Sequence, residues 1–192
     1  AASLNLPMIY MKAKEENKDF YKVLDIYMEM IRGLLIRRYN AVAESRASTN
    51  PLAFTQGGIR GGNLQPNDKI GDLVNGFTAS FGITALNELN QLHEGKPLHE
   101  SDGVFLNEVV DYFNNTIEKF KNEDGKLYAA YGVPAESLAG TQLQQFRKKY
   151  GIIDGVSDRE YFTNSFHAHV SAEINPFTKQ DNWTSRARKL FC

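Results

Sequence analysis

The feature that most constrains the fold of this chain is an alternation of short β-type runs with longer helical runs. Apolar side chains recur every three or four positions in the helical runs, as Phe20, Leu24, Tyr27 and Ile31 do in the first of them. Strands that alternate with helices tend to pair in parallel, so the pattern predicts an α/β fold: a mainly parallel sheet or barrel with helices outside it. We expect strands near 3–10, 76–81, 126–131 and 163–170, and helices at about 17–46, 83–94, 102–122 and 135–150.

The length and composition fit one globular domain. The chain has 192 residues, of which 42% are hydrophobic and 11% aromatic, enough for a sizeable core. The formal net charge of -1 provides no basic field for a nucleic-acid backbone. No run approaches the roughly 20 apolar residues of a membrane span. We therefore expect a cytoplasmic protein whose partners include neither nucleic acid nor membrane. The single cysteine, Cys192, cannot form an internal disulfide and has no assigned role.

Two residue groups are weak candidates for a site. His167 and His169 would share one face of the strand expected at 163–170, but two ligands without a defined third are too few for a metal. Partly buried, hydrogen-bonded histidines are the preferred interpretation, and no metal site is predicted. The glycine pairs of "TQGGIRGGN", within the interval 47–71, match neither of the common phosphate-binding glycine patterns. A flexible loop is the better interpretation there.

The strongest signal is "YGVPAES", residues 131–137, which lies between an expected strand and an expected helix. Pro134 suits the first position of a helix, and Glu136 and Ser137 then fall in its first turn. The N–H groups of a first helical turn lack intrahelical partners and, with the helix dipole, favour an anion. A helix start that only caps itself remains the alternative, and the charge of Glu136 opposes an anion unless its side chain points away.

Five segments, in order along the chain, resemble one enzyme family. They are "SLNLP" (3–7), "SFGITALNEL" (80–89), "YGVPAES" (131–137), "FRKKYGIIDGVSDREYFTNSFH" (146–167) and "EINPFTK" (173–179). Together they resemble the anaerobic ribonucleoside-triphosphate reductases, the oxygen-sensitive glycyl-radical class. "YGVPAES" followed by "FTNSFH" is the most specific part of this resemblance.

The resemblance implies a fold and a substrate site. The fold would be part of a ten-stranded α/β barrel of the glycyl-radical type, and residues 1–192 would be one domain from the C-terminal part of that barrel. The turn would seat the phosphates of a ribonucleoside triphosphate on backbone amides. The implied substrate-binding residues are Pro134, Ala135, Glu136, Ser137, Leu138, Asn164, Ser165 and His167.

The chemistry implied by the resemblance is replacement of the ribose 2′-hydroxyl by hydrogen. The parent enzyme would use a glycyl radical, formate as reductant, a structural zinc and ATP or dNTP effectors, with a radical-SAM activase as partner and a homodimeric state. The thiyl-forming cysteine and the radical glycine would lie outside residues 1–192, so we expect no catalytic residue in this chain and no activity from it alone. A stand-alone phosphate-binding α/β module, or a piece of another glycyl-radical enzyme, remain the alternatives.

Overall fold

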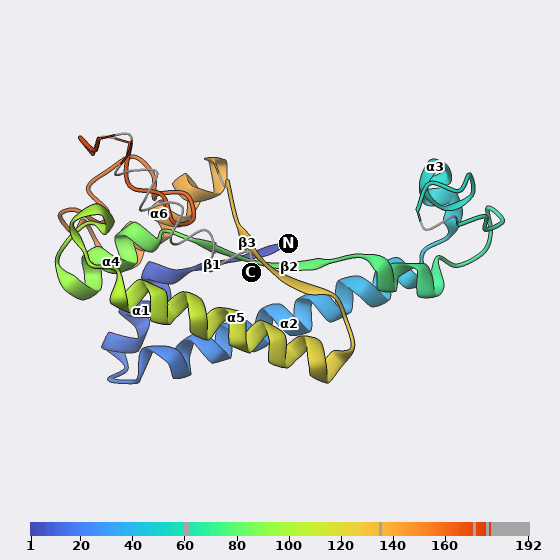
Figure 1. The fold of residues 1–192 in the computed structure, drawn as a ribbon, viewed down its shortest axis with the longest axis horizontal. Coiled ribbons are helices and arrows are strands. Elements are labelled where there is room, and N and C mark those ends of the chain that lie inside the picture. Colours follow the sequence, from blue (N-terminus) through green and yellow to red (C-terminus); the bar gives the residue numbers. More distant parts are fainter. Residues whose placement is uncertain (60–61, 135, 171, 176, 178–192) are drawn as a thin grey trace.

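The computed structural model describes residues 1–59, 62–134, 136–170, 172–175 and 177. A parallel three-stranded sheet lies at its centre, with strands β1 (Ala2–Asn5), β2 (Ala79–Thr84) and β3 (Tyr128–Gly132) in the order β1-β2-β3 (Figure 1). Ala2 lies opposite Phe81, and Phe81 lies opposite Ala130. The predicted parallel α/β arrangement is therefore confirmed, whereas a closed barrel is not seen within these residues.

The longer helices among the described residues are α1 (Leu6–Glu15), α2 (Phe20–Glu44), α4 (Leu86–Glu94), α5 (Val104–Asp124) and α6 (Glu136–Tyr150). Local sequence sets several of their ends. The Asp19 carboxylate accepts the Lys22 N–H at 3.1 Å where α2 begins. Gly125 ends α5 with a φ of +61°, a left-handed conformation that suits glycine. The helices predicted at 17–46, 83–94, 102–122 and 135–150 are confirmed, with ends that differ by at most three residues.

The two faces of the sheet differ in character. On the face covered by α2 and α5 (Figure 1), Phe81 is fully buried and contacts Tyr128 and Phe120 at ring-centroid distances of 5.4 Å and 5.9 Å. The alternate positions, which point to the opposite face, carry small or polar side chains such as Ser3, Ser80 and Ala129. The sheet thus has one face in the core and one face lined mainly by small and polar groups, with Tyr131 as a large aromatic side chain on it.

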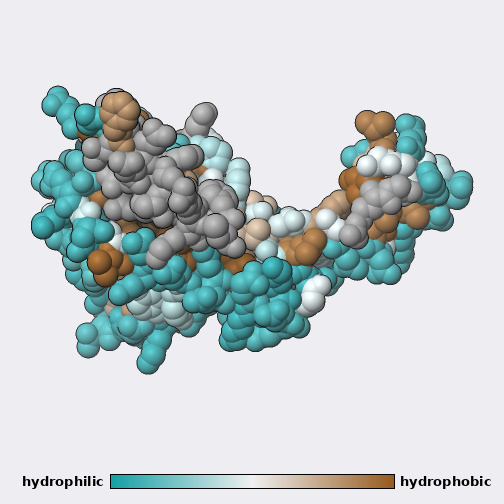
Figure 2. Space-filling model, viewed as in Figure 1, coloured by the Kyte–Doolittle hydropathy of each residue, from teal (hydrophilic) through white to brown (hydrophobic). Residues whose placement is uncertain are grey.

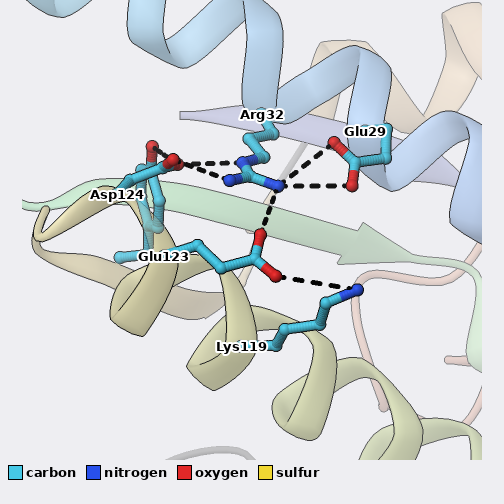
Figure 3. Close-up of polar contacts among 6 residues, drawn as sticks. Glu29, Arg32, Lys119, Glu123 and Asp124 are labelled. Carbon is cyan, nitrogen blue, oxygen red and sulfur yellow. Dashed lines mark hydrogen bonds and ion pairs between the residues drawn. The ribbon is translucent and has the colours of Figure 1, made fainter.

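An ion-pair cluster ties the end of α5 to α2 (Figure 3). The Arg32 guanidinium donates to both carboxylate oxygens of Asp124, from Nε at 2.9 Å and from Nη2 at 2.6 Å. Its Nη1 lies 2.8 Å from Glu123 and 3.3 Å from Glu29. The guanidinium carbon also lies 4.5 Å from the ring centroid of Phe120. This cluster fixes the point at which α5 turns into β3.

The interval 47–71 is not simply a flexible loop, because its described part contains a short helix. α3 (Pro51–Phe54) is accompanied by the 3₁₀ turns η1 (Ala47–Thr49) and η2 (Gly71–Gly76), and a further turn, η3 (Leu98–Glu100), follows α4. Asn50 caps α3 by accepting the Ala53 N–H at 3.2 Å. A small cluster of buried side chains holds this end together: Ala47, Ala53, Phe54 and Ile70. In Figure 2 the α3 end projects from the main body, with a hollow between them.

The strand predicted at 3–10 is wrong beyond Asn5. The chain turns there into α1, because the Asn5 side chain accepts the Met8 N–H at 3.4 Å and Pro7 lies in the first turn of the helix. A capping asparagine followed by a proline is the usual start of a helix. The apolar side chains of Ile9 and Tyr10 are buried on one side of this helix instead of alternating on a strand.

The strand predicted at 163–170 is also wrong. Residues 151–167, which we call the return segment, run back from the end of α6 toward its beginning without forming a strand. Phe162 packs against Phe146 of α6 at 5.7 Å between ring centroids, and Arg147 donates to the backbone carbonyls of Ser157 and Arg159. Several backbone groups of the return segment, such as those of Thr163 and Ser165, are therefore paired with α4 or α6 and not with a neighbouring strand.

Among the described residues, no helix is both long enough and apolar enough to cross a membrane.

Candidate functional site at the carboxyl edge of the sheet

Buried polar side chains gather where the strands end. Those in the described part of the chain lie at the end of β2, on α4 and α6, or on the return segment: Thr84, Asn87, Glu88, Asn90, Gln142, Ser157, Thr163 and Ser165. Burial of a polar group is unfavourable unless it is hydrogen-bonded, so such a cluster marks a specified arrangement. In open parallel α/β sheets, ligands bind outside the carboxyl ends of the strands. This edge is therefore the candidate site.

One part of the cluster joins the ends of β1 and β2 to α6. The Thr84 hydroxyl lies 2.7 Å from the side-chain oxygen of Gln142 and 2.9 Å from the carbonyl oxygen of Leu4. The Asn5 amide donates to the backbone carbonyl of Gln142 at 3.3 Å. The two strand ends and the middle of α6 are thereby held in one arrangement.

A second part of the cluster joins α4 to the return segment. Glu88 is fully buried, and its two carboxylate oxygens accept from the Thr163 hydroxyl at 2.6 Å and from the Thr163 N–H at 3.2 Å. Burial raises the pKa of Glu88, and the hydrogen bonds from Thr163 oppose that rise. In return, the N–H groups of Ala85 and Leu86 donate to the carbonyls of Thr163 and Ser165, each at 3.0 Å. Residues 163–165 are thus bonded in both directions to the start of α4.

Ser165 links the return segment to the turn between β3 and α6. Its hydroxyl donates to the Val133 carbonyl at 3.0 Å, and its backbone has a φ of +47°. A Cβ on Gly132 would lie 3.0 Å from the Phe166 ring and 3.2 Å from the Ser165 hydroxyl oxygen. A side chain at position 132 would therefore require Phe166 and Ser165 to shift by a few tenths of an ångström.

The residues predicted to form the phosphate-binding turn lie beside this contact. Helix α6 is described from Glu136 onward and Pro134 is not helical, so the prediction that Pro134 occupies the first helical position is wrong. Pro134 instead lies in the connection between β3 and α6. It directly follows Val133, whose carbonyl accepts the hydrogen bond from the Ser165 hydroxyl. Ser137 is exposed, and Leu138 is half-buried. Ala135 lies outside the described residues.

The second predicted group, Asn164, Ser165 and His167, forms a turn in which the His167 N–H donates to the Asn164 carbonyl at 3.0 Å. The hydrogen bond from the Ser165 hydroxyl to the Val133 carbonyl therefore places this group beside the predicted phosphate turn. His169 stacks on Tyr161 at 6.0 Å between ring centroids, and burial lowers its pKa. In the part of the chain that the structure describes, no three His, Cys, Asp or Glu side chains are grouped so as to hold a metal ion.

Residues 1–185 match the family model for anaerobic ribonucleoside-triphosphate reductase. The chain belongs to this family. It is 29% identical over 184 residues to the anaerobic ribonucleoside-triphosphate reductase of Salmonella typhimurium, an alignment that covers 93% of this chain and 26% of that protein. It is 28% identical over 183 residues to the reductase of enterobacteria phage T4, covering 92% of this chain and 29% of that protein. The chain thus spans little more than a quarter of the length of these relatives.

The fold agrees with that of an anaerobic reductase. A crystal structure of the anaerobic ribonucleotide reductase from Thermotoga maritima, with citrate in its active site, superposes with a TM-score of 0.75 and 18% sequence identity. The match covers 98% of this chain and 32% of the Thermotoga chain. The mixed α/β fold with its parallel sheet is therefore shared with this reductase.

Proposed function

We propose that this chain is part of an anaerobic ribonucleoside-triphosphate reductase and supplies the turn that binds the substrate phosphates. In this proposal the phosphates contact the turn at Pro134–Leu138, which includes Ala135, Glu136 and Ser137, and approach Asn164, Ser165 and His167. The observation that carries the proposal is the bond from the Ser165 hydroxyl to the Val133 carbonyl, within a chain whose family match runs over residues 1–185. That bond unites two separate segments at the carboxyl edge of the sheet.

We propose the start of α6, and not the start of α4, as the anion site. Amides of the first turn of a helix bind an anion only when no protein group has taken them. At α4, the amides of Ala85 and Leu86 donate to the carbonyls of Thr163 and Ser165. The α6 helix runs over 15 residues, so its dipole favours a phosphate at its beginning. We therefore assign the phosphates to α6 and not to α4.

The wider proposal places this sheet in a ten-stranded α/β barrel, with residues 1–192 forming one domain of its C-terminal part. The small and polar face of the sheet, with Ser3, Ser80 and Ala129, would then face the interior of the barrel, and α2 and α5 would lie outside. A polar inner face suits a barrel that encloses a nucleotide, whereas an apolar one suits a solid core.

The proposed reaction is the reduction of ribonucleotides to deoxyribonucleotides by radical chemistry. We propose that the parent enzyme carries a glycyl radical, uses formate as reductant and ATP or dNTP as effectors, and acts in the cytoplasm as a homodimer with a radical-SAM activase. In this proposal the structural zinc is bound outside residues 1–192.

Replacement of Ser137 by alanine in the complete reductase tests the phosphate turn. We expect S137A to weaken the binding of CTP by about 0.5 to 1.5 kcal/mol, which is the usual net contribution of one hydrogen bond. CTP is the probe because it is a substrate triphosphate and belongs to neither proposed effector class. The matched control is S48A, because Ser48 is equally exposed but lies at the α3 end of the molecule. Equal CTP affinities for S137A, S48A and the unaltered enzyme would contradict the proposal.

A crystal of the complete reductase with a bound nucleotide gives the direct answer. We expect phosphate oxygens within hydrogen-bond distance of the amides at 136–138. Phosphates bound at another place would remove the proposed role of this turn, whatever the effect of S137A.

A further inference from the structure

We infer that Glu88 is a positioning residue for the substrate phosphates, which it never touches: it holds the return segment, through Thr163 and Ser165, against the turn before α6. This inference rests on the proposed function, since it needs the phosphates at that turn. It assigns a role to a buried carboxylate that neither the phosphate turn nor the radical chemistry uses.

The first step is the bond between Glu88 and Thr163. Both carboxylate oxygens of Glu88 are used, one by the Thr163 hydroxyl at 2.6 Å and one by the Thr163 N–H at 3.2 Å. A two-point contact fixes the orientation of a residue as well as its place. Because Glu88 is fully buried on α4, its own position is set by the helix and by the core around Leu86 and Leu89.

The second step concerns Ser165, two residues further along the chain, whose position is fixed by the same helix. Ala85 and Leu86, at the start of the same helix, donate to the carbonyls of Thr163 and Ser165. Ser165 is held in a left-handed conformation, with φ at +47°, which is unfavourable for a serine and persists only where the surrounding structure holds it. The bonds to α4 on both sides of Asn164 provide that enforcement.

The third step runs from Ser165 to the phosphate turn. The Ser165 hydroxyl donates to the carbonyl of Val133, directly before Pro134. Because Gly132 has no side chain, Ser165 and Phe166 of the return segment can lie close to its backbone. A shift of the return segment therefore displaces Val133 and the amides that follow it, and a misplacement of about 1 Å is enough to weaken binding at a preorganised site.

The test compares Thr163→Val with Thr163→Ser in the complete reductase, kept without activation so that binding is measured without turnover. Valine keeps the shape of threonine but removes the hydroxyl donor to Glu88, whereas serine retains the donor. The probes are CTP and cytidine, which differ only in the phosphates. We expect T163V to lower CTP affinity about tenfold and to leave cytidine affinity unchanged, whereas T163S keeps CTP affinity within about twofold of the unaltered enzyme.

The control for the substitution itself is Thr116→Val. Thr116 is half-buried on α5 and its hydroxyl donates to the Tyr112 carbonyl at 2.9 Å, far along the chain from the return segment. We expect T116V to change neither affinity. Should T163V not accumulate as folded protein, Glu88→Gln takes its place, because glutamine keeps the volume and one acceptor oxygen; the same loss confined to CTP is expected.

The outcomes separate the inference from the proposed function. If S137A lowers CTP affinity and T163V does not, the phosphate turn stands and the role of Glu88 is refuted. If T163V lowers CTP and cytidine affinity together, the substitution damages the whole site and the positioning role is equally refuted. If neither S137A nor T163V changes CTP affinity, the proposed function itself fails and the inference fails with it.

Discussion

Replacement of Arg32 by methionine should loosen the junction of α2, α5 and β3 by about 3 kcal/mol. The side chains of Arg32 and Asp124 are only 16% and 15% exposed, and they share two hydrogen bonds at 2.6 Å and 2.9 Å. Breaking a fully buried pair costs about 3 to 5 kcal/mol, because the remaining charge loses its partner; Arg32 and Asp124 are only partly buried. Residual exposure places the junction at the lower end of this range. Methionine keeps an apolar contact with Phe120, so little of the loss comes from packing.

Amide hydrogen exchange in the complete reductase measures this local free energy without unfolding the rest of the enzyme. A loss of about 3 kcal/mol corresponds to roughly 100-fold faster exchange in the last turns of α5 and in β3, since about 1.4 kcal/mol equals a factor of ten. The matched comparison is D124N against E29Q, because both change a carboxylate partner of the same guanidinium. Glu29 is 54% exposed, so E29Q should cost less than about 1 kcal/mol.

The destabilisation caused by R32M should also depend on pH and become smaller at low pH. The hydrogen bond from Arg32 is the largest cause that lowers the pKa of Asp124, and the bond from Tyr128 adds to it. A carboxyl group with a lowered pKa in the folded state stabilises the fold above its unfolded pKa and loses this contribution as pH falls through the folded value. The penalty of R32M should thus stay constant from neutral pH down to about pH 5 and shrink below about pH 4. Less than a threefold change in exchange for R32M at neutral pH would refute the reasoning.

Three further outcomes are expected. A Cβ at Gly82 would lie 2.5 Å from the Val133 side chain, so G82A should destabilise β2 by about 1 to 3 kcal/mol, seen as faster amide exchange there. Truncation of the fully buried Phe146 to alanine should cost about 3 to 5 kcal/mol and release the return segment to exchange, whereas F177A at an exposed position should leave it protected. The 192-residue chain alone should form no deoxyribonucleotide above background with activase and formate under anaerobic conditions, and product formation would contradict this.

The helices could be predicted from sequence because their apolar side chains recur with the helical period over many residues. The 25-residue helix α2 is the clearest case, since its apolar stripe predicted the helix over 17–46 and the helix is found at Phe20–Glu44, with Asp19 as its cap. The short strands were harder to delimit. The strand expected at 76–81 lies at Ala79–Thr84, because a run of small residues such as "GFTASFG" has no marked alternation to fix its ends.

The site could be predicted only in part. The turn at 131–137 carries local glycine and proline signals, and its resemblance to a family pointed to Asn164, Ser165 and His167. Glu88 and Thr163 were missed because their partnership spans 75 positions and leaves no local pattern. One signal was present: "LNEL" places an asparagine and a glutamate between two core leucines, where an uncompensated charge would be costly. A buried partner for Glu88 could have been expected from that, but not its identity.

The order of the strands also bears on how the chain folds during synthesis. β1 pairs with β2 and β2 with β3, so each strand adds to the edge left by the one before it. Ala2 pairs with Phe81, and at about 5 to 20 residues per second β1 is complete several seconds before its partner leaves the ribosome. Phe81 is then covered by Phe120 and Tyr128, which are made later still. Nascent chains in which Phe81 has left the ribosome but Phe120 and Tyr128 have not therefore lack the two rings that cover this side chain, and we expect chaperones to bind the chain at this stage.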